Sequence, residues 1–279
     1  MKSTFNNTYL AARETGGPGD LILLGCPLDA TSSFRGGTRF APDSFWKASW
    51  TLETYSPYLK LDLEEIAFRD EGNLELRQGD LGYCLDLIEA AMAEIAGLGS
   101  RALILGGEHL ATLPIVKALK GLYKDIQIVH FDAHCDLRDE YEGQRLSHAT
   151  VMKRVKELTG AEILSIGVRS GTRQEFDELV PIGSPEAIAA RLKKDLPVYI
   201  TFDMDVFDPS AAPGVTTPEP GGLFFDQVIE YFRVFMGMNI VGADIVELSP
   251  DYDTTLVSSI TTAKVSREIL MLMHLSKTG

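Results

Sequence analysis

The chain has 279 residues, of which 45% are hydrophobic, and this is enough to bury a substantial core in one large domain or two small ones. Its 40 acidic and 26 basic residues give a formal net charge of −14. Nucleic acid and anionic membranes are therefore poor candidates for the main partner, because both require a positive protein surface. The charge is compatible with a cationic small molecule but does not select one.

Cysteine usage and hydropathy favour a reducing compartment. The three cysteines, Cys26, Cys84 and Cys135, are odd in number and widely spaced, which gives no disulfide framework. The N-terminal stretch lacks the apolar core of a secretion signal, and no apolar run approaches the ~20 residues that span a bilayer. We therefore expect a cytoplasmic protein.

Short apolar runs alternate with amphipathic stretches along almost the whole chain. The runs, whose β-branched and apolar character suits strands covered on both faces, are Leu21–Gly25, Ile66–Arg69, Ala102–Leu105, Ile126–Phe131, Ile163–Val168, Val198–Phe202 and Ile240–Val246. Apolar residues at helical spacing predict helices over Ser44–Thr54, Leu81–Leu98, His109–Leu119, Ser147–Leu158, Pro185–Leu192, Phe225–Phe235 and Ser258–Leu275. Asp43 is the candidate N-cap of the first of these helices. The alternation, without a Pro- or Ser-rich linker, predicts a single α/β domain over residues 1–279 with a mostly parallel sheet between helix layers.

In such a sheet ligands bind beyond the carboxyl ends of the strands, so the residues that follow a strand are the candidates for chemistry. One predicted strand runs directly into Asp132, His134 and Asp136. In an extended chain this spacing places all three side chains on one face. Ala133 and Cys135 would then turn the other way, into packing.

Two more predicted strands end in polar side chains of the same kinds. The strand over Val198–Phe202 leads into Asp203 and Asp205, and the strand over Ala102–Leu105 leads through two glycines to His109. Each cluster alone would more often be a solvated loop or a helix cap. Together, four carboxylates and two imidazoles form a ligand set for two divalent cations, whose charge offsets the cost of burying carboxylates. Such ligands suit Mn²⁺ better than structural Zn²⁺, which favours Cys and His.

These motifs resemble those of the ureohydrolases, the arginase and agmatinase family. The resemblance rests on Gly-Gly-Glu-His at 106–109, Asp-Ala-His-Cys-Asp at 132–136 and Thr-Phe-Asp-Met-Asp at 201–205, and it extends over most of the chain. It implies a three-layer α/β/α fold with a mostly parallel eight-stranded sheet, of the type shared with metal-dependent deacetylases. It also implies two Mn²⁺ ions per chain. One ion would be held by His109, Asp132, Asp136 and Asp203, and the other by Asp132, His134, Asp203 and Asp205.

The family's catalytic residues match three positions of this sequence. By the resemblance, Asp136 would pass a proton to the leaving amine, His148 would exchange protons with the site, and Glu247 would hold the guanidinium group of the substrate. Ala149 stands where the family more often has glycine. Asp244 resembles a structural acid of the family, and a capping or core-network role for it is equally open.

The implied reaction hydrolyses a guanidino group to urea and an amine. The stretch 137–147 lacks the small hydroxyl and amide residues that arginases use to recognise an amino acid, and no acid follows Arg169 at the arginase-like position. Both departures favour agmatine, whose terminal ammonium Asp139, Glu140 or Glu142 could attract. Aminopropylagmatine, arginine, guanidinobutyrate and formiminoglutamate remain alternative substrates. The last two carry carboxylates and would need a basic contact, for which the candidates are Arg35, Arg138 and Arg145.

Other classes of protein are also open at this point. A metal-dependent deacylase of the deacetylase type would hold one Zn²⁺ ion instead of two ions. A non-catalytic regulator would release no urea, and a structural α/β binding module would be indifferent to chelators. The family further leads us to expect a homotrimer or homohexamer, without a nucleic-acid or membrane partner.

Overall fold

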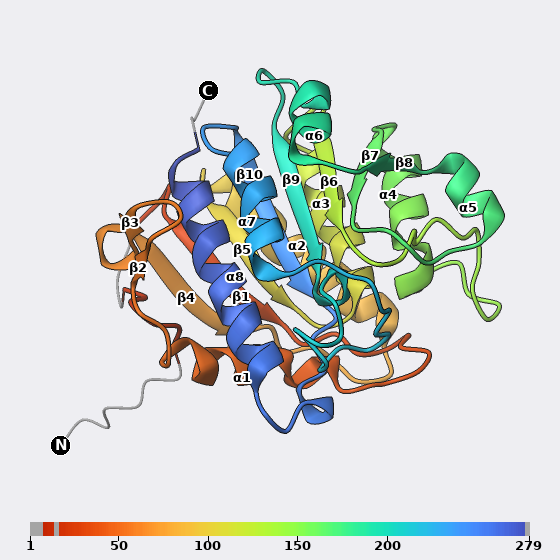
Figure 1. The fold of residues 1–279 in the computed structure, drawn as a ribbon, viewed down its shortest axis with the longest axis horizontal. Helices are drawn as coiled ribbons and strands as arrows, with labels where there is room; N and C mark the ends of the chain where they lie inside the picture. Colours follow the sequence, from red (N-terminus) through yellow and green to blue (C-terminus); the bar gives the residue numbers. More distant parts are fainter. Residues whose placement is uncertain (1–7, 14–16, 277–279) are drawn as a thin grey trace.

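Parallel strands form an eight-stranded sheet in the order β4-β1-β5-β10-β9-β6-β7-β8 (Figure 1). The computed structural model describes residues 8–13 and 17–276, so most of the N-terminal stretch inspected for a secretion signal lies outside the described residues. The strands of this sheet are β1 (Leu21–Cys26), β4 (Phe68–Asn73), β5 (Arg101–Gly106), β6 (Gln127–Phe131), β7 (Ile163–Ile166), β8 (Val180–Ile182), β9 (Val198–Asp203) and β10 (Ile240–Val246). A separate antiparallel pair consists of β2 (Tyr55–Ser56) and β3 (Leu61–Asp62).

Helices cover both faces of the sheet and complete three layers. One layer contains α2 (Leu81–Gly97), α3 (Thr112–Lys120) and α4 (Val151–Thr159). The other contains α1 (Ala41–Ser49), α6 (Pro185–Arg191), α7 (Phe225–Val234) and α8 (Val257–His274). The short α5 (Arg173–Glu178) connects β7 to β8. The expected α/β/α fold with a mostly parallel eight-stranded sheet is confirmed. No helix among the described residues is both long and apolar enough to cross a membrane.

The apolar character of the strands follows from this layering. In β1, Leu21 and Leu23 pack in the core beneath α1, α7 and α8, whereas Ile22 and Leu24 pack in the core beneath α2, α3 and α4. Successive side chains of a strand point to opposite faces, so a strand with helices on both sides needs an apolar residue at every position. All six residues of β1 are buried.

Several details of the predicted elements are wrong or incomplete. Asp43 does not cap α1; the helix begins at Ala41, Phe40 occupies the N-cap position and Asp43 lies in the first turn. The edge strand β8 and the helix α5 were not anticipated from the residues. The helix expected from His109 begins instead with a 3-10 turn over His109–Ala111, which precedes α3. This turn follows β5 directly and sets the position of the His109 side chain.

Candidate active site

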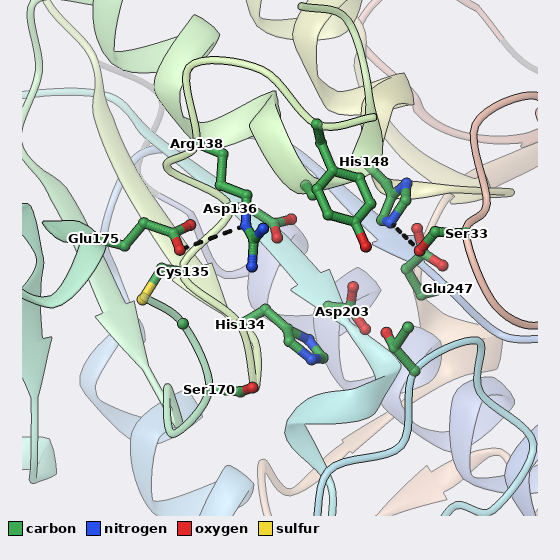
Figure 2. A pocket seen from close by; sticks show the side chains of 14 residues that line it. Ser33, His134, Cys135, Asp136, Arg138, His148, Ser170, Glu175, Asp203 and Glu247 are labelled. Atoms are coloured by element: carbon green, nitrogen blue, oxygen red, sulfur yellow. Dashed lines mark hydrogen bonds and ion pairs between the residues drawn. The ribbon is translucent and has the colours of Figure 1, made fainter. Parts of the chain in front are cut away.

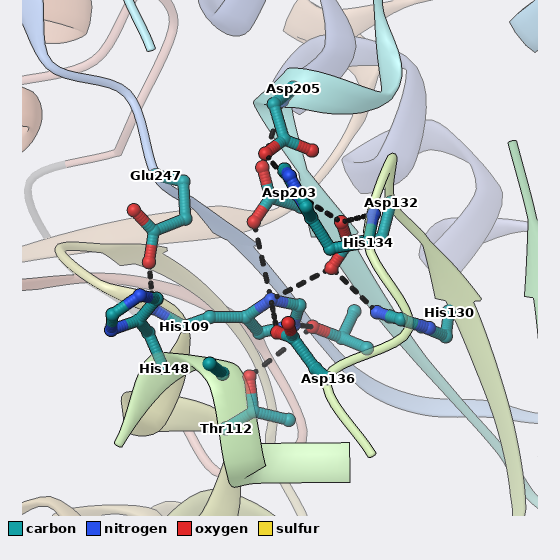
Figure 3. A network of polar contacts seen from close by, with 12 residues as sticks. His109, Thr112, His130, Asp132, His134, Asp136, His148, Asp203, Asp205 and Glu247 are labelled. Carbon is teal, nitrogen blue, oxygen red and sulfur yellow. Dashed lines mark hydrogen bonds and ion pairs between the residues drawn. The ribbon is translucent and has the colours of Figure 1, made fainter. Parts of the chain in front are cut away.

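Polar side chains gather where β5, β9 and β6 end, near the middle of the sheet. His109 follows β5, Asp132 follows β6, and Asp203 is the last residue of β9. All three side chains are buried. The six residues of the predicted ligand set therefore converge on one edge of the sheet; they are His109, Asp132, His134, Asp136, Asp203 and Asp205 (Figure 3).

His109 stands at the centre of the first half of this cluster. Its Nδ1 atom lies 3.2 Å from one oxygen each of Asp132, Asp136 and Asp203. Within the described residues this buried nitrogen forms no hydrogen bond. Three carboxylate oxygens converging on one buried imidazole nitrogen form the donor set expected around a divalent cation.

Hydrogen bonds on the far side of the ring aim Nδ1 at this cluster. The Thr201 hydroxyl has a single proton, which it donates to Asp244 at 2.6 Å. Its oxygen, 3.0 Å from His109 Nε2, must therefore accept the Nε2 proton. Asp244 also accepts hydrogen bonds from Thr112 at 2.8 Å and Tyr199 at 2.5 Å, which identifies it as part of a buried network. With Nε2 protonated, the lone pair of Nδ1 is free to bind a cation.

The second half of the cluster surrounds His134. Its Nδ1 atom lies 2.9 Å from Asp205 Oδ2 and 3.4 Å from Asp132 Oδ1. Asp132 thus faces both halves, Oδ2 toward His109 and Oδ1 toward His134. A carboxylate in this position is suited to bridge two cations.

Burial and mutual repulsion shift the ionisation of the cluster. Burial, reinforced by the charge of Asp205, raises the pKa of Asp203 well above its usual value. Burial also raises the pKa of Asp136, with a further contribution from Asp132. Burial opposes ionisation of Asp132 as well, but the neighbouring imidazoles, His130 first and then His109 and His134, hold its pKa well below the usual range. The cluster has an excess of negative charge that divalent cations would balance.

The predicted extended conformation of Asp132–Asp136 is wrong at its end. β6 stops at Phe131, and Asp136 has a left-handed backbone with φ 52°. This turn brings the Asp136 carboxylate to His109. Ala133 and Cys135 are buried as expected.

His130, which the sequence analysis missed, supports Asp132 from inside β6. Its Nε2 atom lies 2.8 Å from Asp132 Oδ2, and its Nδ1 atom lies 3.1 Å from the Ser165 hydroxyl. The ring is fully buried. A histidine between the apolar residues Val129 and Phe131 of a strand was the available signal, because a buried imidazole requires a polar partner.

Glu247 lies beyond the end of β10 and faces the cluster. One carboxylate oxygen accepts a hydrogen bond from the His109 amide at 2.6 Å, and the other accepts one from the Thr216 hydroxyl. Its backbone is left-handed, with φ 65°, which is unusual for a residue with a side chain of this size. Burial raises the pKa of Glu247 to about 7, although the nearby His148 opposes the shift. A bound cation would restore the charged form.

A pocket of about 240 Å³ opens over the cluster (Figure 2). The described residues that line it are Ser33, His134, Cys135, Asp136, Arg138, Tyr141, His148, Ala149, Ser170, Gly171, Glu175, Asp203, Thr217 and Glu247. Glu247 and His148 lie on one side of the pocket, and Arg138 and Glu175 lie on the other. The pocket therefore has room for a small elongated molecule with polar groups at both ends.

The acids expected to attract a substrate tail, Asp139, Glu140 and Glu142, are not among these lining residues. Asp139 instead pairs with Arg154 at 3.4 Å. The carboxylate that lines the far side of the pocket belongs to Glu175, which lies 3.6 Å from Arg138 Nε.

Two of the three candidate cations for a carboxylate tail are engaged away from the pocket. Arg35 donates to the carbonyl oxygens of Pro213 and Val215. Arg145 pairs with Glu157 at 3.8 Å. Only Arg138 of the three lines the pocket among the described residues.

Known proteins resemble this chain over nearly its whole length. A model of the arginase family matches residues 19–272. An agmatinase of Halalkalibacterium halodurans is 38% identical over 94% of this chain and 95% of its own, and an agmatinase of Bacillus anthracis is 39% identical over 90% and 91%. The crystal structure of the agmatine ureohydrolase of Thermoplasma volcanium superposes with a TM-score of 0.87 at 33% identity, covering 98% of this chain and 96% of that chain. The chain belongs to the arginase family and is a hydrolase of guanidino C–N bonds, with agmatinases as its near relatives.

Proposed function

We propose that the protein hydrolyses agmatine to putrescine and urea and that it uses two Mn²⁺ ions per chain. The observation that carries the proposal is the convergence of three carboxylates on Nδ1 of His109 beneath a pocket that Glu247 also lines. Agmatinases among the near relatives support the choice of substrate. The proposal assigns these activities to a single domain that spans the chain.

The proposed ligands divide into two overlapping sets. The first set is His109, Asp132, Asp136 and Asp203, and the second set is Asp132, His134, Asp203 and Asp205. Asp132 supports this division because its two oxygens face different imidazoles. When bound, the two cations would supply a water molecule whose pKa is low enough for it to act as a nucleophile near neutral pH.

Glu247 would bind the guanidinium of the substrate. Its carboxylate is buried and fixed by the His109 amide and the Thr216 hydroxyl, so it needs little reorganisation when the substrate arrives. A guanidinium offers several N–H donors, and pairing with a carboxylate gives charge-assisted hydrogen bonds. This pairing would hold the central carbon of the substrate over the Asp136 side of the cluster.

Asp136 and His148 would handle the protons. Oxygen adds to the guanidinium carbon, and the bond from that carbon to the alkylated nitrogen breaks. The nitrogen leaves as an amine, so it must gain a proton, which Asp136 would transfer from the attacking water. His148, at the pocket wall, would exchange protons between the site and solvent.

One observation favours a second substrate. Arg138 lines the end of the pocket opposite Glu247, where it could pair with a carboxylate tail such as that of 4-guanidinobutyrate. Glu175 occupies the same end and would favour an ammonium tail instead. Since Arg138 is already paired with Glu175 and lies 4.9 Å from the ring of Tyr141, we rank agmatine first.

A comparison of urea release tests the substrate directly. Purified protein with Mn²⁺ would be given agmatine, arginine, aminopropylagmatine and 4-guanidinobutyrate at equal concentrations. The proposal predicts the highest kcat/KM for agmatine. A clear preference for arginine or for 4-guanidinobutyrate would overturn the choice of agmatine.

Two variants test the site. His134→Asn and Asp136→Asn should each lower urea release by at least about 100-fold, because each removes a proposed metal ligand. The exposed substitution Asp226→Asn, in the first turn of α7, is the matched control and should leave the rate unchanged. Near-normal activity of both site variants would contradict the assignment.

Metal analysis should give two ions per chain, and light scattering should report the proposed homotrimer or homohexamer.

A further inference from the structure

The ring of His148 has a hydroxyl group near each of its nitrogen atoms. Nδ1 lies 3.3 Å from the Thr31 hydroxyl and 3.3 Å from the Ser147 hydroxyl. Nε2 lies 3.2 Å from the Ser33 hydroxyl, on the Glu247 side of the pocket (Figure 2). Neutral imidazole carries its proton on one nitrogen only, so the partners decide which nitrogen acts as the base.

The proton of the Thr31 hydroxyl is already committed to Glu108. Thr31 Oγ1 donates to Glu108 Oε1 at 2.8 Å. The other oxygen of Glu108 accepts the backbone N–H groups of Ala30 and Thr31, both at 2.6 Å, and the Glu108 side chain is fully buried. These bonds fix the carboxylate beside Thr31. Toward His148, therefore, the Thr31 oxygen has only lone pairs to offer.

Those lone pairs select one tautomer of His148. The Thr31 oxygen accepts the backbone N–H of His148 at 3.0 Å, and its remaining lone pair faces Nδ1. If Nδ1 of His148 were unprotonated, its lone pair would face the lone pair of the Thr31 oxygen, and the two would repel each other. A protonated Nδ1 can donate to Thr31 and to Ser147 together, and this leaves Nε2 with the free lone pair, facing the Ser33 hydroxyl.

We infer that Thr31, held by Glu108, is a positioning residue that keeps His148 in the Nδ1–H tautomer, so that Nε2 is the atom that takes up and releases protons. The inference rests on the proton-handling role proposed for His148. Ser33 would mark the path of the proton, because its hydroxyl contacts Nε2 at the pocket wall. Neither Thr31 nor Glu108 is required to touch the substrate.

Replacing Thr31 with residues of matched shape tests the coupling. Thr31→Val keeps the shape but removes the hydroxyl. It should lower kcat about 10- to 100-fold, a loss that is part of what general acid–base catalysis contributes. KM should change little. Thr31→Ser should restore most of the rate. In a His148→Asn background, Thr31→Val should have no further effect, because its partner is gone. An equal loss in both backgrounds, or a Thr31→Ser variant as slow as Thr31→Val, would show a purely structural role and overturn the inference.

A spectroscopic measurement decides the tautomer without reference to activity. Isotope-edited infrared difference spectra between histidine-labelled wild type and its His148→Asn variant contain the ring modes that distinguish the two neutral tautomers. We expect the Nδ1–H form in the wild type and a mixture in Thr31→Val. Observation of the Nε2–H form in the wild type would overturn the inference.

A matched control separates hydroxyl removal from general damage. Thr51 donates its hydroxyl to the Ala48 carbonyl oxygen, away from the pocket, so Thr51→Val should change neither kcat nor the spectrum. If the wild type releases no urea from any guanidine compound, the proposed function fails, and the tautomer spectrum still decides the present inference.

Discussion

The imidazole of His130 shows how much a single buried side chain contributes behind the candidate ligands. It contacts Asp132 at 2.8 Å and is itself held by Ser165. Side chains that orient a metal ligand typically change metal affinity 10- to 100-fold when removed. We therefore expect His130→Asn to weaken Mn²⁺ binding by about 10- to 100-fold, because the Asp132 carboxylate loses the partner that fixes its orientation. Calorimetric titration of the metal-free protein with Mn²⁺ measures this change.

His274, exposed at the end of α8, provides the matched control for that measurement. His274→Asn should bind Mn²⁺ as the wild type does. An unchanged Mn²⁺ affinity in His130→Asn would mean that Asp132 is oriented by its other contacts alone, and it would contradict the prediction.

At the residue scale, the sequence indicated the candidate metal ligands but not the contacts that support them. The ligands could be predicted from their position after a strand and from their chemistry. Asp132 and Asp203 stood out because a carboxylate directly after an apolar strand is costly without a counter-charge. Thr31 and Glu108 could not be linked in the same way, since their contact joins residues 77 positions apart and depends on how two loops meet. The left-handed backbone of Glu247 was equally invisible, because no glycine or asparagine marks it.

At the element scale, the most restrictive contact lies where β5 leaves the sheet. A Cβ atom on Gly107 would lie 1.8 Å from the Leu28 carbonyl oxygen. This oxygen belongs to the backbone, so it cannot rotate away as a side chain could. Leu28 also accepts the Glu108 amide at 2.8 Å, and this bond fixes the turn that presents His109. Gly107→Ala should therefore destabilise the protein by about 3 kcal/mol or more and weaken metal binding as well. Chemical denaturation and Mn²⁺ titration measure the two effects.

Gly97, the last residue of α2, is the comparison for this substitution. Its Cβ would meet no atom within 4 Å, so Gly97→Ala should be neutral or stabilise the helix by up to about 1 kcal/mol. If Gly107→Ala were as stable as Gly97→Ala, the close approach of the β5 turn to Leu28 would not constrain the fold.

The elements that the sequence indicated well are those whose burial imposes a pattern. β1 is a continuous apolar run, and β10 is interrupted only by Asp244, because helices cover both faces of these strands. β8 has only three residues, includes Pro181 and lies at the edge of the sheet, so its sequence carries little of that pattern. α5 is only six residues long and owes its start to a capping box between Thr172 and Glu175. Asp43 failed as a cap because the helix already begins at Ala41, three residues before the predicted start at Ser44. Pro42 lies in the first turn of this helix, where a missing N–H group costs no hydrogen bond within the helix.

At the scale of the whole molecule, the acidic cluster must be reconciled with a formal net charge of −14. Without cations, the carboxylates around His109 and His134 favour the protonated form of both rings. Burial opposes protonation of His109 and His134, but the surrounding aspartates outweigh it and raise both pKa values above the usual value near 6.5. The stabilising effect of these protons on the metal-free fold is complete below about pH 6.5 and is lost as the pH rises through the raised pKa values. Asp203, whose pKa is also raised, acts in the same direction.

Cation binding must displace those protons, so Mn²⁺ should stabilise the fold more strongly as the pH rises through the neutral range. We expect the gain in Tm on adding Mn²⁺ to a chelator-treated sample to be larger at about pH 8 than at about pH 6. Asp132, whose lowered pKa acts in the opposite direction, is already ionised throughout this range and does not alter the sign. Asp132→Asn removes the residue that faces both imidazoles, and it should abolish the gain at either pH. A gain that stayed constant or shrank with rising pH would mean that cations bind without displacing protons from the cluster, and the six side chains would then not be the ligands.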